Sequence, residues 1–526
     1  MLSSSKLKII LIIASVGVGL FQAWSESTPT LLLDLSHVAV TSEVGIERLG
    51  INLNYLMDDP HQRPPGSVPL TSVLPLIAPR FLRYPGGNKS DSYLWSTPPY
   101  TRANPGLAVQ GAWDWPAMDR NIFDRERQRW IIDPLDFDEF MAICRKNNTT
   151  PILVVPYDSS QQQADTHHQR AKKEKLLEAA VAWVHYCREK KFPVYGWEIG
   201  NETYFLANGF RAETYAQDLI HFSRAMKAAD PTARIGANGP ERMMARGKGE
   251  KDRPGAPPWW KIVLQRAGDV IDFVSIHEYP CWQWRGYDFT LKARRPLCRA
   301  PGEIRAAIRR WAPPDRRRKL RIVITETNAA DWSKGGWPAL NNAGHALVLA
   351  EMIGEYLQHP DLDMVLVWNT RWIHNGRRPP ELWDALTPTN LLNPTGQIMR
   401  IWHHYAQSHW MKIRQSPPHL RVFPMIDETG RRVSVLIINP ALRGTCRLTI
   451  RLPREIVEGM RVWEWKGKHP EAIDPVWNEL PCQLQQHRVQ PDTMELGINL
   501  NPLSLTIVSN APPLLDLNSI PKQKRP

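Results

Sequence analysis

Short apolar runs alternate with longer amphipathic stretches through most of this chain, from about residue 46 to about residue 412. The runs are rich in β-branched residues and too short for helices, whereas the stretches repeat apolar positions about every three to four residues. This alternation is typical of a parallel sheet covered by helices. We predict eight strands, at residues 50–55, 81–84, 151–155, 194–200, 234–237, 272–277, 322–325 and 364–368. We predict helices at residues 137–146, 172–190, 212–228, 303–311, 342–357 and 396–406.

The pattern changes after about residue 412, where alternating apolar and polar residues form short runs without a helical period. Runs of this kind are typical of a β-sandwich. The sequence therefore predicts an α/β protein, with a (β/α)8 TIM barrel over residues 46–412 and a C-terminal β-sandwich domain over residues 413–515. Segments rich in Pro, Gly and Trp follow several barrel strands and are expected at the C-terminal face of the barrel, at residues 58–79, 89–134, 240–260 and 278–302.

Both ends of the chain have a distinct composition. Residues 1–25 have the pattern of a secretory signal peptide, with Lys6 and Lys8 ahead of an apolar run at residues 9–21. The run is short for a membrane span, and an uncleaved anchor is the alternative. Residues 516–526 form a basic tail. We expect a secreted or periplasmic protein with no membrane association after signal cleavage.

Composition and charge narrow the functional classes. The chain has 42% hydrophobic and 23% charged residues, as folded globular proteins do. Its formal net charge of +13 suits a soluble surface or, alternatively, a preference for acidic polysaccharides or an anionic wall. Acidic residues are interspersed and no predicted helix is strongly basic, which argues against a nucleic-acid partner.

The six cysteines are compatible with export. The pairs that could form disulfides are Cys281 with Cys298 and Cys446 with Cys482. Cys144 and Cys187 lie on apolar helical faces and are expected to be buried thiols. The sequence has no Cys-x-x-Cys and no cluster of His ligands, so we expect neither a metal site nor another cofactor.

Two predicted strands each deliver a glutamate at the C-terminal end. The strand at residues 194–200 is followed by Asn201-Glu202, and the strand at residues 322–325 by Glu326. A carboxyl group beside an amide suits general acid catalysis on a sugar. A pair of such carboxyl groups about 5–5.5 Å apart is what a retaining glycosidase requires.

Three motifs in this order resemble a known clan: Arg83-Tyr-Pro-Gly-Gly-Asn88, Trp197-Glu-Ile-Gly-Asn201-Glu202 and Thr325-Glu326. The chain is similar to the (β/α)8 retaining glycoside hydrolases and, among them, to the α-L-arabinofuranosidases. The resemblance covers residues 46–412 and, more loosely, the tail domain. It implies that strand-like runs at residues 30–45 join the C-terminal sandwich, and that the partner is an oligo- or polysaccharide substrate.

The two glutamates take different roles in such a mechanism. Glu202 is the candidate acid/base, and the negative charge of Glu326 would help to raise its pKa. Glu326 is the candidate nucleophile, and the resemblance places Arg83 and Tyr279 beside it. The alternatives are a strand-end salt bridge for Glu202, a structural ion pair for Arg83 and an unrelated loop aromatic for Tyr279.

Further candidate residues would bind the substrate. Asn201 is expected to bind the sugar 2-hydroxyl. Asn88 matches a sugar-contacting residue of the resembled family or, alternatively, caps a turn. His277 contacts sugar or a carboxylate, or is a satisfied barrel histidine. Aromatic rings stack on sugars, and two or three of the following should do so: Trp95, Trp282, Trp284, Trp332, Trp368 and Trp372.

Two positions depart from the resembled family. Asn54 stands where the family has a strand-one glutamate that binds the furanose, and Asn369 follows Trp368 where a glutamine is usual. We expect Asp58 or Asp59 to reach the pocket beside Glu326 instead.

The sequence thus predicts a secreted retaining glycoside hydrolase acting on plant or microbial polysaccharides, with α-L-arabinofuranosidase as the favoured activity. The alternatives are a glucuronidase, a xylosidase, an endo-glycanase or a non-hydrolytic carbohydrate-binding relative. Linkage, exo or endo action and oligomeric state stay open.

Overall fold

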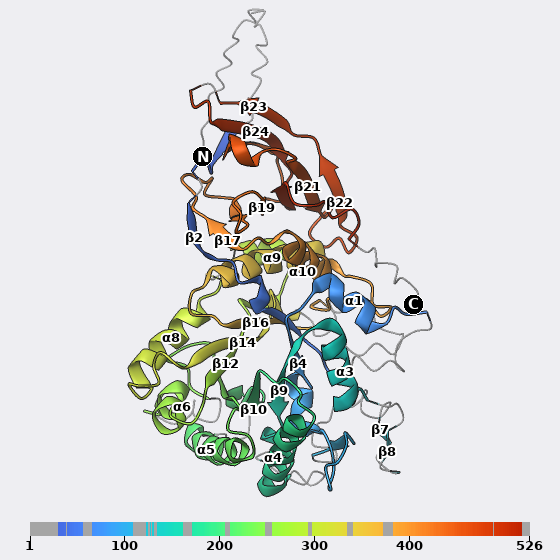
Figure 1. Cartoon of the computed structure of the whole chain (residues 1–526), viewed down its shortest axis with the longest axis vertical. Helices are drawn as coiled ribbons and strands as arrows, with labels where there is room; N and C mark the ends of the chain where they lie inside the picture. The colour runs from blue at the N-terminus through green and yellow to red at the C-terminus, as the bar shows by residue number, and fades with distance from the viewer. Residues whose placement is uncertain are drawn as a thin grey trace, which may run out of the picture.

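Eight parallel strands close into a barrel in the order β10-β11-β12-β14-β16-β3-β4-β9, as predicted (Figure 1). The computed structural model describes residues 30–37, 39–55, 66–108, 123–124, 127, 129–130, 134–160, 171–205, 211–247, 255–292, 297–333, 340–371, 382–487 and 489–517. The barrel strands are β3 (Leu49–Asn52), β4 (Phe81–Tyr84), β9 (Thr150–Val155), β10 (Gly196–Ile199), β11 (Ile235–Gly239), β12 (Phe273–Glu278), β14 (Arg321–Thr327) and β16 (Met364–Val367). Each lies at a predicted position, with ends shifted by a few residues.

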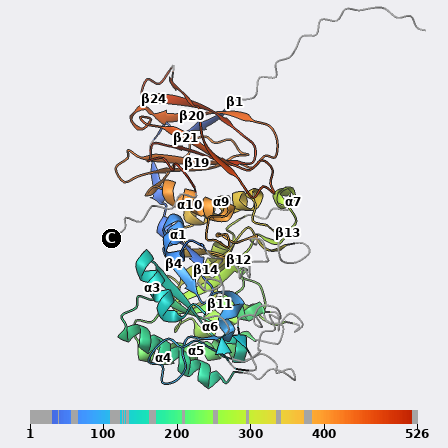
Figure 2. The same ribbon diagram turned by 90° about the vertical axis from the view of Figure 1, so that its right-hand side faces the viewer.

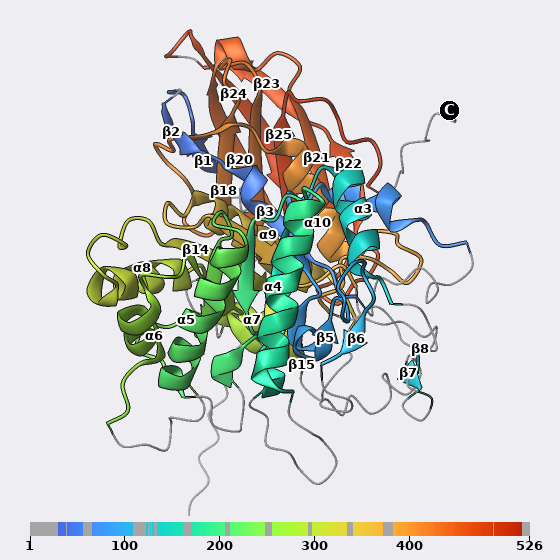
Figure 3. The ribbon, with the colours of Figure 1, turned by 60° about the horizontal axis from the view of Figure 1, so that its bottom comes forward.

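The predicted helices are also present around the barrel, and Figure 3 shows several of them on its outer surface. They are α3 (Phe137–Asn147), α4 (Lys173–Glu189), α5 (Ala212–Ala229), α8 (Ala300–Trp311), α9 (Ala343–Gln358) and α10 (Pro394–Tyr405). The start of α3 has the expected chemistry, because Asp136 and Glu139 form a reciprocal capping box.

Three helices were not predicted: α1 (Leu70–Ile77) and α7 (Tyr287–Lys292) lie within segments rich in Pro, Gly and Trp, and α6 (Trp259–Ala267) starts at the end of another. For α6 the reason is tertiary. Trp259 and Trp260 are fully buried and donate their indole N–H groups to the carbonyls of Asn238 and Pro240 at the C-terminal end of β11. These anchors form only in the folded barrel, so the local pattern does not reveal the helix.

Beyond the barrel, two sheets pack as a sandwich around their own apolar core. The four-stranded sheet has the order β1-β20-β24-β23 and the seven-stranded sheet the order β2-β17-β18-β19-β25-β21-β22. The strands are β1 (Thr30–Asp34), β2 (Val40–Glu43), β17 (His409–Met411), β18 (Arg421–Ile426), β19 (Val433–Asn439), β20 (Cys446–Pro453), β21 (Arg461–Lys466), β22 (Val476–Leu480), β23 (Gln483–Gln486), β24 (Thr493–Leu500) and β25 (Ser504–Ser509). The leading strands β1 and β2 thus lie in the sandwich, each paired with a strand from the other end of the chain.

Helices α9 and α10 lie between the barrel and the seven-stranded sheet (Figures 1 and 2). A side chain at Gly354 of α9 would collide with the ring of Phe423 on β18, so helix and sheet pack closely there. Trp465 on β21 donates its indole N–H to Gln397 of α10 over 2.8 Å. Because α9 is covered on both sides, it is apolar nearly all round.

Neither cysteine pair considered above forms a disulfide in the structure. The thiol of Cys281 points to the carbonyl of Gln283 at 3.0 Å, and that of Cys298 to the carbonyl of Met352 on α9 at 3.6 Å. Cys144 is buried, as expected, and so is Cys187.

The signal segment and most of the basic tail lie outside the described residues. Within the described residues, no helix has the length and apolar character needed to cross a membrane.

Candidate active site

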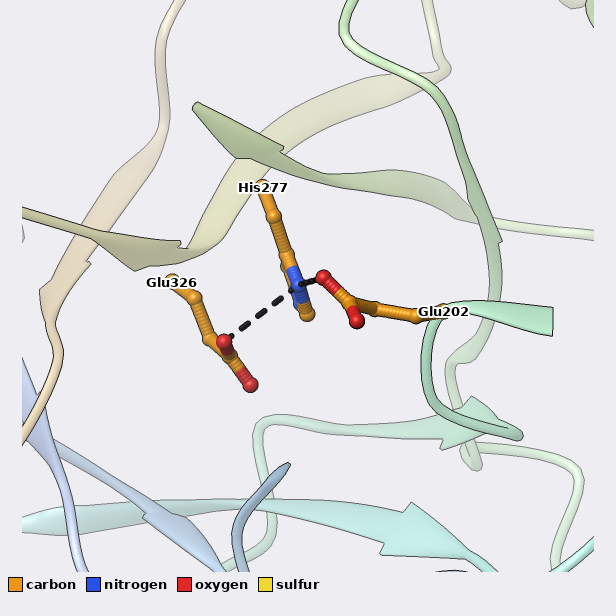
Figure 4. Close-up of side chains that lie close together, drawn as sticks. All are labelled: Glu202, His277 and Glu326. Atoms are coloured by element: carbon orange, nitrogen blue, oxygen red, sulfur yellow. Dashed lines mark hydrogen bonds and ion pairs between the residues drawn. The ribbon is translucent and has the colours of Figure 1, made fainter. Parts of the chain in front are cut away.

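The C-terminal ends of the barrel strands bring the predicted polar residues together at one mouth. Arg83 comes from β4, His277 from β12 and Glu326 from β14, while Glu202 follows β10 (Figure 4 shows the last three). In a (β/α)8 barrel this face carries the chemistry.

Arg83 is fully buried at the centre of the site and uses every nitrogen of its guanidinium. Its Nε donates to Glu198 at 2.8 Å and its Nη1 to Glu326 at 2.7 Å. Nη1 also reaches Asn52 at 3.1 Å, and Nη2 donates to Asn201 at 2.8 Å. One cation therefore fixes two carboxylates and the amide next to Glu202.

A β-bulge explains how β14 directs two consecutive side chains inward. The pairing register slips between Ile324 and Glu326 against β12, and between Ile324 and Thr327 against β16. As a result Thr325 donates to Glu198 at 3.2 Å, while Glu326 turns to Arg83. Bulges next to active sites re-aim side chains in this way.

Both oxygens of Glu326 are held by donors. Arg83 binds one oxygen, and the hydroxyl of Tyr279 donates to the other over 3.0 Å. Burial raises the pKa of Glu326, and the nearby His277 and Arg83 oppose that shift. The carboxylate is therefore fixed in orientation and supported in its ionised form.

Glu202 sits on a turn of left-handed backbone, with φ of +76° at Gly200 and +50° at Glu202 itself. A Cβ at position 200 would collide with the hydroxyl of Thr203, so only glycine fits there. Burial is the largest cause that raises the pKa of Glu202 to about 7; Arg83 lowers it, and Glu198 and Glu241 raise it further. A carboxyl group with that pKa can carry a proton near neutral pH.

His277 bridges the two glutamates (Figure 4). Its Nδ1 lies 2.8 Å from Glu202 and 3.4 Å from Glu326. One atom from each of the three side chains lies within 4.8 Å of the other two. The predicted carboxyl separation of about 5–5.5 Å, as in retaining glycosidases, stays a prediction. Burial lowers the pKa of His277, which favours the neutral ring.

These three side chains are also the cluster, within the described part of the chain, whose atoms lie close enough to hold a metal ion. However, the guanidinium of Arg83 already lies 2.7 Å from Glu326 and would repel a second cation there. The arrangement suits proton transfer and nucleophilic attack better than metal binding. The expected absence of a metal stays a prediction.

Asn201 is oriented from both sides. Its Oδ1 accepts from Arg83, and its Nδ2 donates to Asn88 at 2.7 Å. A primary amide has two N–H donors, so one is left to reach a ligand. Asp158 supports the turn from below by accepting from the backbone N–H of Asn201 and the hydroxyl of Thr203. Asn88 is thus placed against Asn201 as well as in a turn.

Trp368 at the end of β16 covers the glycine turn that precedes Asn88. A Cβ at Gly87 would collide with the Trp368 indole, so the ring lies directly on this turn. The neighbouring Asn54 donates to the carbonyl of Gly86 at 3.2 Å. Asn54 therefore makes a contact within the turn, which is one local reason for an amide at this position.

Sequence reasoning missed the buried carboxylate of Glu198. It pairs with Arg83 and accepts hydrogen bonds from Thr325 and Ser275. The signal was present, because Glu198 is an acidic residue inside a predicted apolar strand, where a buried carboxylate needs a partner.

An open cleft of about 370 Å³ begins at Glu202 and His277. Its further walls include residues that the sequence did not single out, Tyr204, Phe205, Glu241, Gln283, Arg285, Phe289 and Asp331, together with the expected Tyr279 and Trp282. A volume of this size suits a sugar-sized ligand.

Not every expected aromatic residue reaches this mouth. Trp95 is buried against Trp183 and donates to the carbonyl of Ala179, and Trp284 packs against the ring of His345. Both belong to the hydrophobic core rather than to the cleft. Asp58, Asp59 and Trp372 lie outside the described residues.

Comparison with known proteins finds similar chains among sugar-cleaving enzymes. Residues 73–280 match the family model described as the alpha-L-arabinofuranosidase 1 domain. A probable alpha-L-arabinofuranosidase C from Aspergillus fumigatus is 25% identical over 287 residues, which is 48% of each chain. The matches with this and similar curated relatives span about half of their length or less.

Solved structures share the fold over almost the whole chain. A thermostable alpha-L-arabinofuranosidase from Thermotoga petrophila superposes with a TM-score of 0.63 at 18% identity, covering 91% of this chain and 99% of that one. A xyloglucanase from Paenibacillus polymyxa gives a TM-score of 0.60 at 11% identity, covering 92% and 100%. The chain resembles the (β/α)8 glycoside hydrolases and, within them, the arabinofuranosidases.

Proposed function

We propose that this chain is a retaining glycoside hydrolase whose nucleophile is Glu326 and whose acid/base is Glu202. The observation that carries the proposal is the asymmetry of two adjacent carboxyl groups. Glu326 is bound by a cation and a hydroxyl, whereas the pKa of Glu202 is raised to about 7. Two adjacent carboxyl groups, one held by a cation and a hydroxyl and the other without such partners, suit the two roles that double displacement requires.

In the first step the Glu202 carboxyl group donates its proton to the glycosidic oxygen while Glu326 attacks the anomeric carbon. The leaving group departs as an alcohol, and the sugar stays bound to Glu326 as an ester. Arg83 keeps Glu198 as a counterion when Glu326 loses its charge. That loss also removes a negative charge near Glu202, so its pKa falls and it becomes a suitable base for water in the second step.

The proposed sugar is a terminal α-L-arabinofuranosyl unit. The match over residues 73–280 supports it, and so does the amide pair Asn88 and Asn201 beside Glu202. Asn54 gives its amide to a backbone carbonyl, so the furanose would rely on other groups where the resembled family uses a glutamate.

We also propose that the protein is exported and acts on polysaccharide of plant or microbial origin. Lys6 and Lys8 ahead of the apolar run at residues 9–21 support export. Detection of the mature N-terminus near residue 25 outside the producing cell would test this. Retention of the full-length chain in the cell would contradict it.

The activity is tested with p-nitrophenyl glycosides of α-L-arabinofuranose, β-D-xylopyranose and β-D-glucuronic acid, with Glu326→Gln as the matched inactive control. The first-formed product, followed by NMR, should keep the anomeric configuration of the substrate. Cleavage of a pyranoside alone would remove the furanose assignment and keep the mechanism. Sugar binding without any turnover would favour the non-hydrolytic alternative.

A further inference from the structure

Two exposed aromatic side chains lie on the wall of the cleft. Phe205 is 47% exposed and Trp282 is 58% exposed, although both are large and apolar. Their ring centroids are 6.4 Å apart and their planes differ by only 15°. Near-parallel, solvent-exposed aromatic faces in a cleft are suited to the C–H faces of a sugar.

The backbone ties this aromatic pair to the acid/base. The N–H of Phe205 donates to the carbonyl of Glu202 over 2.6 Å, so the ring follows directly from the turn that positions the carboxyl group. Trp282 lies on β13 (Cys281–Trp284), which pairs with β15 (Ala330–Ser333) on the same side of the cleft. Asn201 and Asn88, which support the proposed binding of the transferred sugar, are not among the residues that line this cleft.

The acid/base protonates the oxygen of the leaving group, so the side of Glu202 is the side on which the leaving group lies. The ring pair is therefore placed to bind the part of the substrate that departs. Both residues line the same cleft as Glu202, so a sugar held by the rings remains within reach of its proton.

The charge on this side of the cleft is acidic. Glu241 and Asp331 line it; because burial together with Glu202 raises the pKa of Asp331 to about 7, Asp331 carries only part of a negative charge at neutral pH. The cation on this wall, Arg285, is engaged by Gln283 at 2.9 Å and lies over the ring of Phe289 at 5.2 Å. A carboxylate on the leaving group would therefore lie near two acidic side chains, whereas the cation on this wall is already engaged.

We infer that Phe205 and Trp282 form a leaving-group subsite for a neutral sugar ring, and that Glu241 and Asp331 disfavour a uronic acid there. This inference rests on the proposed hydrolase function for its kinetic test. It assigns selectivity for neutral glycans to a chain whose overall charge is strongly positive.

The kinetic test compares two substrates that share the sugar found to be cleaved. One is its methyl glycoside, and the other carries a neutral oligosaccharide as leaving group. Phe205→Ala/Trp282→Ala should lower kcat/KM for the oligosaccharide by about ten- to a hundredfold and change the methyl glycoside by less than about threefold. Leu442→Ala, an exposed apolar change in the sandwich domain, is the control and should alter neither. Equal losses on both substrates would overturn the subsite.

A second comparison tests the effect of Glu241 and Asp331 on leaving-group selectivity. At pH 7 a leaving group bearing a uronic acid should give a lower kcat/KM than its neutral counterpart, and Glu241→Gln/Asp331→Asn should reduce that difference several-fold. Preference for the uronic acid in the unaltered protein would overturn this part.

A binding measurement separates failure of the subsite from failure of the hydrolase proposal. Titration calorimetry on Glu326→Gln, with and without Phe205→Ala/Trp282→Ala, uses the neutral oligosaccharide alone as ligand. Weakened binding of about tenfold or more on removing the rings supports the subsite even if no glycoside is cleaved. Unchanged binding would exclude it even in an active enzyme.

Discussion

The two ends of the barrel each carry a hollow of nearly the same size, about 370 Å³ at the C-terminal mouth and about 380 Å³ at the opposite end. The second hollow is lined by residues at or just before the strand starts, among them Tyr195, Arg234, Asp272, Arg321 and Asp363. Both contain aromatic rings and charged groups. Neither volume nor composition distinguishes the site from its counterpart.

The two hollows differ in how their charged side chains are paired. At the end opposite the C-terminal mouth, Arg321 pairs with Asp363 at 2.9 Å and Lys227 pairs with Asp272 at 2.7 Å, and these side chains remain partly exposed. Partly exposed ion pairs of this kind are screened by solvent and contribute little to the free energy of unfolding. At the C-terminal mouth the guanidinium of Arg83 is buried against two carboxylates, those of Glu198 and Glu326. Among the described residues, no lysine or arginine is in direct contact with Glu202, whose ion-pair partner is His277. A buried carboxyl group without a full set of cationic partners has a shifted pKa, and shifted pKa values are typical of active sites.

The largest effect should come from the nucleophile. Glu326→Gln keeps the shape but cannot form the glycosyl ester, so kcat should fall by at least about 10⁴-fold. Steady-state assays with an activated aryl glycoside measure this, and azide should restore turnover of Glu326→Ala with inverted product. Substantial residual activity of Glu326→Gln would place the nucleophile elsewhere.

Glu198 should come next. Glu198→Gln leaves the Arg83 cation with one carboxylate where it had two, and breaking a buried ion pair costs about 3–5 kcal/mol of unfolding free energy. The excess positive charge would also make Glu326 less basic, so kcat should decline. Thermal unfolding and kinetics on one preparation test both effects. An unchanged midpoint and rate would show that Arg83 does not need this counterion.

The pH profile should sharpen the comparison further. Glu202 must be protonated for the first step, so kcat/KM should fall as pH rises through about 7, the raised pKa of that group. On the acid side activity should be lost where Glu326 becomes protonated. Glu241→Gln removes one charge that raises the pKa of Glu202, so the alkaline limb should move to lower pH by a fraction of a unit. A shift to higher pH would contradict this assignment.

The smallest effect should come from a substitution in the hollow opposite the C-terminal mouth. Arg321 is 63% exposed in its pair with Asp363, so Arg321→Ala should change the unfolding free energy by less than about 1 kcal/mol. Its kcat/KM should equal that of the unaltered protein. A clear kinetic loss would show that the two ends of the barrel are coupled.

Much of the fold was accessible from local pattern. Strand and helix positions followed from periodicity, because each barrel unit buries one face in a regular way. Helix α6 could not be predicted, since it depends on Trp259 and Trp260 reaching carbonyls at the C-terminal end of β11. The two cysteine pairs were likewise undecidable, because spacing along the chain does not specify which groups the thiols face.

The candidate active site could likewise be predicted only in part from the sequence. Strand-end position was enough to bring Glu202, Glu326, Arg83 and His277 to one mouth. It could not show that the β14 bulge turns Thr325 and Glu326 inward together, since a bulge is a property of paired strands. Nor could it separate Trp282 on the cleft from Trp95 in the core, because both occur in loop-like sequence.

The position of β1 also bears on the time course of folding. Thr30 pairs with Arg447, so the first described strand obtains its partner only after more than four-fifths of the chain has been made. At about 5–20 residues per second, synthesis of the intervening segment takes about 20–80 s. During that interval an apolar strand has no sheet to join and is open to association with other chains. A strand that is made late in synthesis, β20, therefore covers the edge of the first described strand.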